Sequence, residues 1–287
     1  MLREPAPDLS VVSTLLLDAD TTLVACEEPA YSAAAGVRLQ LLHRLGATRR
    51  WDVDRLREEW RGRSFRRIVL DLAVEEGVRI GPSEVDDWVA REERCVTSRL
   101  ASSLEPDPTV RHALEELRHR RDLAAVASTT RSRLDTCLSA AGLDDLFPSG
   151  RRFSGEDSLA LAASKPDPAV HLHALFCLGV RPREALAVES TRCGVRAAGA
   201  AELAVVGNLA HVPAVERPAR RATLLAAGAL AVVDDWAGLA ALLGAADRDA
   251  DRGAARGTAA VPRQRGARTS PLTDAPSGPL AGTVEAV

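Results

Sequence analysis

The stretch Leu15-Leu16-Leu17-Asp18-Ala19-Asp20-Thr21-Thr22-Leu23 places two aspartates directly after an apolar run. That run, Val11–Leu17, is continuous rather than alternating, which is typical of a strand buried on both faces in a parallel sheet. Ligand sites in such sheets lie beyond the carboxyl ends of the strands, where Asp18 and Asp20 fall. Two neighbouring acids can divide one reaction, one as nucleophile and the other handling a proton. The alternative is a pair of turn or helix-cap residues, but no helix signal follows at once.

Length and composition limit the classes of protein to which the chain can belong. The chain has 287 residues, enough for one large α/β domain or a core domain with a smaller insertion. A net charge of −3 gives no electrostatic reason to expect nucleic acid or an anionic membrane, and no protein partner is evident. The five scattered cysteines favour buried thiols in a reducing compartment over disulfides or a zinc site. Because Val11–Leu17 is too short to span a bilayer and lacks signal-peptide flanks, we expect a cytoplasmic protein.

Four further apolar runs predict buried strands, and segments with helical spacing separate them. The predicted strands are Leu123–Ala127, Ala185–Val188, Leu203–Val206 and Ala229–Val233, and the predicted helices are Arg131–Ala141, Ala169–Leu178, Arg192–Ala200 and Ala219–Ala227. Strands that alternate with helices form right-handed crossovers and a parallel sheet covered on both faces. The sequence therefore predicts an α/β protein with a Rossmann-like parallel sheet.

The long stretch between the first two predicted strands is different, because it contains helical patterns alone. The expected helices are Ala30–Leu45, Val53–Trp60, Phe65–Glu76, Ser83–Ser98 and Val110–Arg120. Since this is too long for a simple crossover, we interpret residues 25–100 as an inserted α-helical cap domain, with linkers near Cys26–Pro29 and Ser102–Pro108. The core would then comprise residues 1–24 and 101–245. Residues 246–287 lack apolar periodicity and are predicted to be a disordered tail.

Lys165 is the only lysine, although Lys and Arg together number 37. Ammonium is a compact point charge and guanidinium a broad fork, so a site that presses one positive charge between a carboxylate and a small anion would prefer Lys. Chance retention in an Arg-rich chain is the alternative. Ser128-Thr129 follows the second predicted strand and Glu189 a later one. Alone, the first pair would be a helix N-cap and Glu189 an ordinary loop acid.

These residues together resemble the haloacid dehalogenase-like (HAD) superfamily, in the branch with a helical cap after the first strand, which includes phosphoglycolate phosphatases and β-phosphoglucomutases. The first family motif, four hydrophobic residues and Asp-x-Asp-Gly-Thr/Val-Leu, is similar to the stretch that ends at Leu23. The second, a Ser or Thr ending a hydrophobic strand, resembles Ala124-Ala125-Val126-Ala127-Ser128. The third resembles Lys165-Pro166-Asp167-Pro168, and the fourth, Glu-Asp-Ser-x-x-Gly, resembles Glu189-Ser190-Thr191-Arg192-Cys193-Gly194 only in part. The match runs in order over about residues 11–243.

The resemblance implies a role for each matching residue. Asp18 would attack a phosphoester to form an aspartyl-phosphate, and Asp20 would protonate the leaving group and then activate water. Ser128 would hydrogen-bond the transferring phosphoryl group, with Thr129 as a further substrate-binding candidate. Lys165 would bridge that group and Asp18. Such sites work by positioning and charge neutralisation.

The resemblance also implies a magnesium ion, held by Asp18, the backbone carbonyl of Asp20 and the acids of the fourth motif, here Glu189. Ser190 stands where a metal-binding Asp is expected. Magnesium favours charged oxygen ligands in near-octahedral geometry, and a neutral hydroxyl is a poor replacement.

Two other positions depart from the pattern. Thr21 replaces Gly, and a β-branched residue is strained if that turn needs positive φ. Ala25 replaces an acid that is common in the following loop. Asp20 itself argues against dehalogenation, because the dehalogenase members lack this second Asp.

Between two predicted cap helices, Arg61-Gly62-Arg63-Ser64 lies where the phosphoglucomutase relatives carry a basic-Gly-x-Ser-Arg recognition loop. Because guanidinium suits phosphate and carboxylate, Arg61, Arg63 and Ser64 are candidates to bind a distal anionic group of the substrate. A solvated basic helix start is the alternative. Phe65 follows the Ser in place of the family Arg, which favours a phosphatase over a mutase.

We therefore predict a magnesium-dependent phosphatase that acts on a small phosphorylated metabolite. A sugar phosphomutase is the rival within the family. The rival from another class is a catalytically silent relative that binds a phosphorylated ligand or a partner protein, which Thr21 and Ser190 motivate. A mere binder has no need of a nucleophile together with an acid, and this favours the enzyme.

Overall fold

A single six-stranded sheet forms the centre of the molecule in the computed structural model, which describes residues 7–46, 57 and 60–258. All neighbouring strands are parallel, in the order β3-β2-β1-β4-β5-β6. The strands are β1 (Thr14–Asp18), β2 (Asp122–Ala127), β3 (Arg152–Ser154), β4 (Ala185–Glu189), β5 (Ala204–Asn208) and β6 (Ala231–Val233). The predicted α/β class with a Rossmann-like parallel sheet is confirmed.

Strand β1 lies at the middle of the sheet and is buried along its whole length. Its side chains alternate between the two faces. Leu15 and Leu17 join one hydrophobic cluster, and Leu16 joins the other. Helices cover both faces, as a parallel sheet requires.

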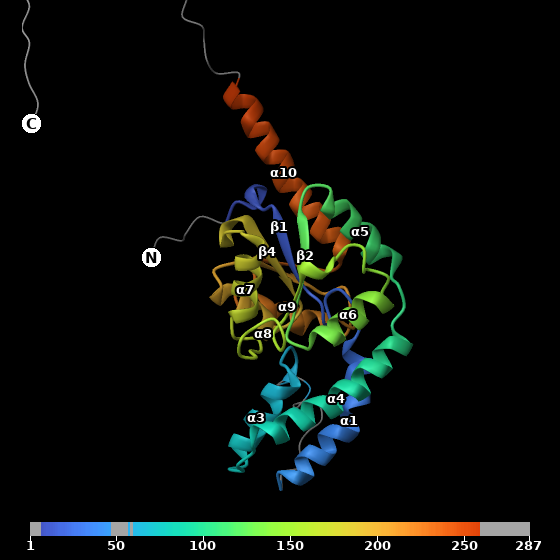
Figure 1. The fold of residues 1–287 in the computed structure, drawn as a ribbon. Coiled ribbons are helices and arrows are strands. Elements are labelled where there is room, and N and C mark those ends of the chain that lie inside the picture. Colours follow the sequence, from blue (N-terminus) through green and yellow to red (C-terminus); the bar gives the residue numbers. More distant parts are fainter. Residues whose placement is uncertain (1–6, 47–56, 58–59, 259–287) are drawn as a thin grey trace, which may run out of the picture. The chain divides into compact units, whose positions relative to one another are not determined.

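The first cluster packs against α5 (Pro108–Arg118), α6 (Arg131–Ala140) and the first turns of α10 (Trp236–Thr258). The second packs against α7 (Ala169–Leu178), α8 (Arg192–Ala200) and α9 (Arg217–Ala226). Figure 1 shows α7 and α8 on one side of the strands and α5 and α6 on the other. With both faces covered, the carboxyl edge of the sheet is the place where polar loops gather.

The predicted helices after the first strand are present as α1 (Glu27–Arg44), α3 (Phe65–Glu75) and α4 (Pro82–Ser103). They lie together in Figure 1 and bury a third cluster that includes Trp60, Phe65 and Trp88. The apolar stripe of α3 explains this, since Phe65, Ile68, Val69, Leu72 and Ala73 lie at helical spacing and are all buried. The insertion of helices after the first strand is therefore confirmed.

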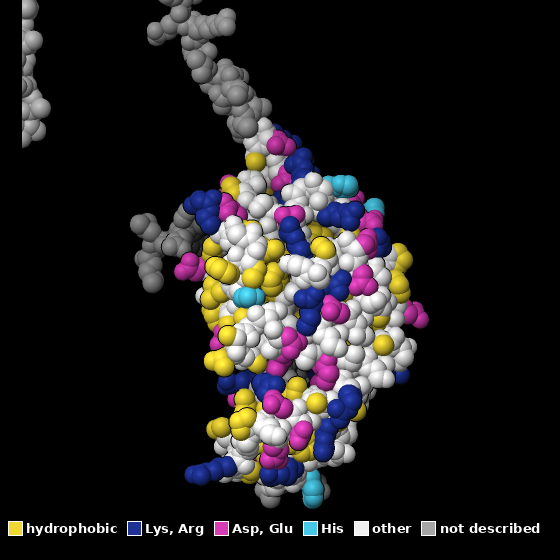
Figure 2. All heavy atoms as spheres, viewed as in Figure 1, with side chains coloured by type: hydrophobic (Ala, Val, Ile, Leu, Met, Phe, Trp, Pro, Cys, Tyr) yellow, Lys and Arg dark blue, Asp and Glu magenta, His cyan; other side chains and the backbone are white. Residues whose placement is uncertain are grey.

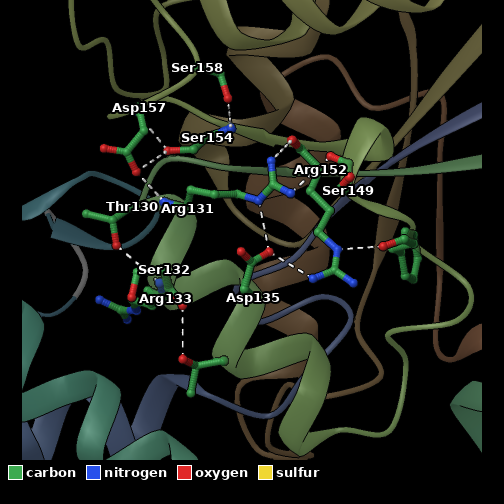
Figure 3. A network of polar contacts seen from close by, with 12 residues as sticks. Thr130, Arg131, Ser132, Arg133, Asp135, Ser149, Arg152, Ser154, Asp157 and Ser158 are labelled. Carbon is green, nitrogen blue, oxygen red and sulfur yellow. Dashed lines mark hydrogen bonds and ion pairs between the residues drawn. The ribbon is translucent and has the colours of Figure 1, made fainter.

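Strand β3 was not predicted, because its three residues carry no apolar run. Polar contacts hold it at the edge of the sheet instead (Figure 3). Asp135 accepts hydrogen bonds from Arg131 Nε at 2.9 Å and Arg152 Nη1 at 2.8 Å. Ser154 Oγ donates to the carbonyl of Thr129 at 2.6 Å, which ties the end of β3 to the loop after β2.

Some predicted boundaries differ from the structure. The linker placed at Cys26–Pro29 is wrong, because α1 begins at Glu27. Helix α10 was not predicted, and it continues through the start of the supposed tail to Thr258. The chain divides into two compact units, Met1–Ala250 and Asp251–Val287, and all six strands lie in the first. The predicted helix Val53–Trp60 and the tail after residue 258 lie, apart from Arg57 and Trp60, outside the described residues.

Acidic and basic side chains are intermingled on the face seen in Figure 2, as expected for a net charge of −3. Among the helices that the structure describes, none is both long enough and apolar enough to cross a membrane.

Two phenylalanines test how much stability the core supplies. Phe147 is fully buried in the first cluster, and Phe176 is 85% exposed on α7. We expect Phe147→Ala to lower the free energy of unfolding by about 3–5 kcal/mol through lost burial and a residual cavity. Phe176→Ala is the matched control and should change it by less than about 0.5 kcal/mol. Urea unfolding measures both, and equal effects would contradict this description of the core.

Candidate active site

The ammonium of Lys165 lies between two carboxylates that end neighbouring strands. Its Nζ is 2.7 Å from Asp18 Oδ1, at the end of β1, and 2.7 Å from Glu189 Oε1, at the end of β4. Lys165 is 1% exposed, Asp18 5% and Glu189 0%. A buried charge needs such partners, because leaving water costs several kcal/mol per ion. This contact brings together three predicted residues that are far apart in the sequence.

Burial and shared charge shift the protonation of this cluster. Burial raises the pKa of Asp18 to about 7; the negative charges of Glu189 and Asp20 add to this, and Lys165 opposes it. Burial also raises the pKa of Glu189, again against Lys165. Burial alone would lower the pKa of Lys165, but its two carboxylates raise it above the usual value. One ammonium therefore stays charged, while the two carboxyl groups compete for it.

His171 of α7 lies behind this cluster and was not predicted. Its Nε2 is 3.1 Å from Glu189 Oε1, and the ring is fully buried. Burial, together with the charge of Lys165, lowers the pKa of His171 to about 3, so the imidazole is neutral and donates from Nε2. On the other side, a Cβ at Gly194 would lie 1.8 Å from Glu189 Oε2. Glu189 is therefore fixed between α7 and α8 and directed at Lys165.

Asp20 lies beyond Asp18 and is only half-buried. Its Oδ2 accepts a hydrogen bond from Thr129 Oγ1 at 3.1 Å. The helix that follows β2 is capped by Thr130, whose hydroxyl accepts from the Arg133 amide. Thr130, and not Thr129, is therefore the N-cap of this helix, and the Thr129 hydroxyl bonds Asp20.

The turn after Asp20 has the positive φ that makes a β-branched residue unfavourable there. Thr21 has φ +67°, a conformation that costs an L-residue on the order of 1–2 kcal/mol. Its hydroxyl lies 2.6 Å from Ser190 Oγ, which offsets part of this cost. Thr22 donates to Asp18 Oδ2 at 2.7 Å and to Ser190 Oγ at 2.9 Å. Three hydroxyl groups thus form a cluster beside the Asp18 carboxylate.

The loop before α3 lies against the carboxyl edge of the sheet. Ser128 Oγ donates to the carbonyl of Gly62 at 3.1 Å and accepts from the Lys165 amide at 3.3 Å. The amide of Ser64 donates to Ser164 Oγ at 2.7 Å. Gly62 has φ +79°, and a Cβ there would lie 2.6 Å from Thr191 Oγ1, so glycine is required at this close approach. The loop therefore closes over the predicted catalytic residues.

The three loop residues predicted to bind substrate have other partners in the structure. Arg61 Nη2 lies 2.7 Å from Glu27 Oε1, and Arg63 Nη1 lies 3.0 Å from Asp71 Oδ2. Ser64 is the N-cap of α3, and its hydroxyl accepts from the Arg67 amide. Both arginines line a cavity over the site, but Ser64 does not.

The cavity has a volume of about 100 Å³ and extends from Asp18 and Asp20 to α1 and α4. Most of the residues that line this cavity were not among the site residues predicted from the sequence. Its wall includes the aromatic rings of Tyr31 and Trp60 and five arginines, Arg38, Arg57, Arg61, Arg63 and Arg133. Arg61 and Arg63 belong to the predicted recognition loop, but no motif covers the two rings or the other three arginines. In a chain so rich in arginine, a single arginine carries no signal before its neighbours in space are known.

The predicted magnesium ligands do not form a metal site in this arrangement. Within the described ranges, no group of three or more His, Cys, Asp or Glu side chains could hold a metal ion. Glu189 Oε1 is occupied by Lys165 and His171, and the Ser190 hydroxyl bonds Thr21 and Thr22. The other oxygen of Glu189, Oε2, is buried against Gly194 without a hydrogen-bond partner among the described residues. Asp18 is then the one carboxylate that contacts this hydroxyl cluster, whereas magnesium favours charged oxygen ligands. The residues present do not fit magnesium.

The protein thus has a Rossmann-like parallel sheet with acids and a buried lysine at its carboxyl edge. The model of the haloacid dehalogenase-like hydrolases matches residues 12–202. The chain belongs to this family. Among curated proteins, none matches the sequence.

Solved structures share the fold over most of the chain. A haloacid dehalogenase-like protein of unknown function from Agrobacterium tumefaciens is 25% identical, with a TM-score of 0.60 over 82% of this chain and 98% of that one. A β-phosphoglucomutase from Clostridium difficile is 18% identical, with a TM-score of 0.58 over 78% of this chain and 92% of that one. A predicted phosphoglycolate phosphatase from Haemophilus somnus is 19% identical, with a TM-score of 0.58 over 81% of this chain and 98% of that one. The expected family is therefore confirmed by the family model, and these neighbours share its fold.

The buried imidazole predicts a pH effect on stability. The unfolded chain binds a proton at His171 below pH 6.5, and the folded chain does so only below about pH 3. His171 should therefore lower the free energy of unfolding as pH falls through this window, by up to about 1.4 kcal/mol per pH unit. His171→Gln keeps an N–H donor and should remove that contribution. Urea unfolding at several pH values measures it, with the exposed His43→Gln as matched control; a constant difference from wild type would contradict it.

The hydroxyl cluster predicts how magnesium binding can be restored. Ser190→Asp should lower stability without metal, because a buried carboxylate replaces a neutral group. Magnesium at ten times its dissociation constant should then raise the free energy of unfolding by about 1.4 kcal/mol, and the wild type should respond far less. Thermal unfolding with magnesium chloride or EDTA measures this, with the exposed Ser132→Asp as control. A wild-type response equal to that of Ser190→Asp would show that hydroxyls suffice.

Proposed function

We propose that this chain is a phosphatase that hydrolyses a phosphoester of a small metabolite through an aspartyl-phosphate on Asp18. The observation that carries the proposal is the convergence of Asp18, Ser128 and Lys165 at the carboxyl edge of the sheet, through contacts of 2.7 Å and 3.3 Å. Asp18 and Ser128 both line the cavity, so the nucleophile and a hydroxyl for the phosphoryl group face the same space. Membership of a hydrolase family supports the same reaction class.

In the first step, Asp18 attacks the phosphorus atom and the bond to the leaving-group oxygen breaks. Asp20 gives its proton to that oxygen and becomes a carboxylate. Lys165 and Ser128 stabilise the negative charge on the phosphoryl oxygens. Since the pKa of Asp18 is raised to about 7 by burial, Lys165 also keeps a useful fraction of the nucleophile ionised.

In the second step, the Asp20 carboxylate takes a proton from a water molecule, which attacks the aspartyl-phosphate and releases phosphate and Asp18. Thr129 holds Asp20 by its 3.1 Å hydrogen bond, which leaves the other carboxyl oxygen for proton transfer. Cys26 Sγ, at 3.8 Å, is the neighbour of that oxygen. The closed loop around Gly62 would exclude bulk water from both steps.

We take helices α1, α3 and α4 to be the cap of residues 25–100 and the rest of the first unit to be the core. The loop contacts to Ser128 and Ser164 support this division, because they join the two parts beside the cavity. Arg66 Nε adds an ion pair to Glu156 Oε2 at 2.7 Å. Opening of these few contacts would admit substrate.

A catalytically silent relative is the competing function. The specific observation in its favour is the Thr21–Thr22–Ser190 hydroxyl cluster, which replaces a charged metal ligand. A silent protein would keep the cavity and its ligand but would not release phosphate. Turnover therefore separates the two functions.

Asp18→Asn is expected to abolish phosphate release from a panel of small phosphoesters, by roughly a thousandfold or more, because the nucleophile is lost. Phosphate release with and without magnesium measures this. Asp122→Asn is the matched control, since its side chain is 63% exposed at the opposite end of β2. Activity retained in Asp18→Asn would reject the aspartyl-phosphate route. A folded wild-type chain with no turnover across the panel would favour the silent relative.

A further inference from the structure

Helix α7 presents an apolar face at the surface, far from the polar loops of the site. No residue between Ala169 and Leu178 is charged. The inner face of the helix is buried, while on its outer face Leu172 is 47% exposed and Phe176 is 85% exposed. Figure 2 shows hydrophobic side chains gathered over this helix. A helix that is apolar on all sides is normally buried, so the outer face is suited to a partner.

His173 and Cys177 lie on the same outer face, one helical turn apart. The Sγ atom of Cys177 lies 3.5 Å from His173 Nε2 and 3.9 Å from its Nδ1. Cys177 is an exposed free thiol, and His173 is half-buried. The Phe153 ring packs edge-on against the imidazole, with 5.9 Å between the ring centroids, which limits how far the imidazole can turn. A thiol and an imidazole are therefore held side by side next to Phe176.

This pair has the chemistry and the spacing of half a zinc site. Structural zinc is bound tetrahedrally by four ligands, most often Cys sulfur and His nitrogen atoms. Bonds of about 2.3 Å to sulfur and about 2.0–2.1 Å to nitrogen place two such ligand atoms about 3.5 Å apart. The sulfur and Nε2 of the pair have this separation. Among the described residues no third His, Cys, Asp or Glu completes a group of metal ligands, so one chain offers two of the four.

A second copy of the chain supplies the other two ligands. A two-fold axis midway between His173 and Cys177, perpendicular to α7, makes the two helices antiparallel and brings all four side chains together. Leu172 and Phe176 of both copies then cover the metal with apolar surface. The same axis brings the exposed Asp167, before the start of one helix, toward the exposed Arg183, beyond the end of the other. The arrangement that completes the metal site thus also places opposite charges together.

The size of this face indicates that the metal is needed for the dimer. Helix α7 has 10 residues and is therefore about 15 Å long. A specific interface buries about 1,000 Å² or more, and one helix face of this length is at the low end of that range. Bonds from one zinc ion to both copies would add the affinity that the apolar contact lacks.

We propose that α7 is a zinc-dependent dimer interface, in which His173 and Cys177 of two copies bind one zinc ion through two imidazoles and two thiolates. Each thiol releases its proton to solvent when its sulfur binds the metal, so two protons leave for each zinc bound. The inference is independent of the proposed reaction, because neither residue lines the cavity over Asp18.

Sedimentation velocity of the full chain tests the interface, with a phosphine reductant present throughout and either zinc chloride or EDTA. We expect a monomer in EDTA and, with zinc, a dimer that holds one zinc ion for every two chains. His173→Gln and Cys177→Ala should each raise the dissociation constant of the dimer at least about a hundredfold, because both copies lose a ligand. The exposed His112→Gln and Cys95→Ala are the matched controls and should leave it unchanged.

Cobalt(II) in place of zinc reports the ligands directly. We expect a thiolate-to-cobalt absorption band in the wild type and in Cys95→Ala, and its loss in Cys177→Ala. Phe176→Asp puts a charge into the apolar contact and should weaken the zinc-bound dimer at least about tenfold, although each copy keeps both ligands. Circular dichroism checks that every variant is folded.

Three results would overturn the proposal. The first is a dimer that persists in EDTA and in both ligand variants, because its contact would not need the metal. The second is zinc bound at one ion per chain without dimerisation, which would leave the pair as an adventitious site. The third is a dimer that forms only when the reductant is omitted, because that dimer would be linked by a disulfide. Phosphate release depends on none of these outcomes, so the proposed function stands or fails separately.

Discussion

The buried contact of Lys165 with Asp18 and Glu189 is the constraint on which the site depends. A charged ammonium is tolerated at 1% exposure only because two carboxylates lie within 2.7 Å of it. To meet there, the ends of β1 and β4 must be neighbours, which the central pairing of the sheet provides. The chemistry of the site therefore depends on the order of the strands in the sheet.

The same contact fixes the direction of Glu189, next to a position that departs from the family pattern. Glu189 is directed at Lys165 by His171 and by the absence of a side chain at Gly194, so it is not available to replace the missing acid at position 190. Ser190 instead completes a hydroxyl cluster with Thr21 and Thr22. The strained φ at Thr21 and the hydroxyl at position 190 are therefore linked through one hydrogen bond of 2.6 Å.

Arginine dominates the cation content of the chain, and its environment decides what each residue does. Arg131 and Arg152 fix an edge strand, Arg63 pairs beside a helix, and Arg38 stacks on aromatic rings. Burial and pairing separate these roles, although the side chain is the same. This is why composition alone could not locate the cavity above Asp18.

The sequence by itself determined the strands β1, β2, β4 and β5, the helices between them, and the catalytic candidates Asp18, Asp20, Ser128 and Lys165. Continuous apolar runs and short motifs are local signals, so no partner in space is needed to recognise them. Only the tertiary structure decided the three-residue β3, the continuation of α10, and the partners of Arg61, Arg63 and Ser64. It also brought His171 to Glu189 and Arg38 to a cavity shared with Arg133. These are contacts between residues distant in the chain, and their energies depend on burial and charge that exist only once the sheet and helices have packed.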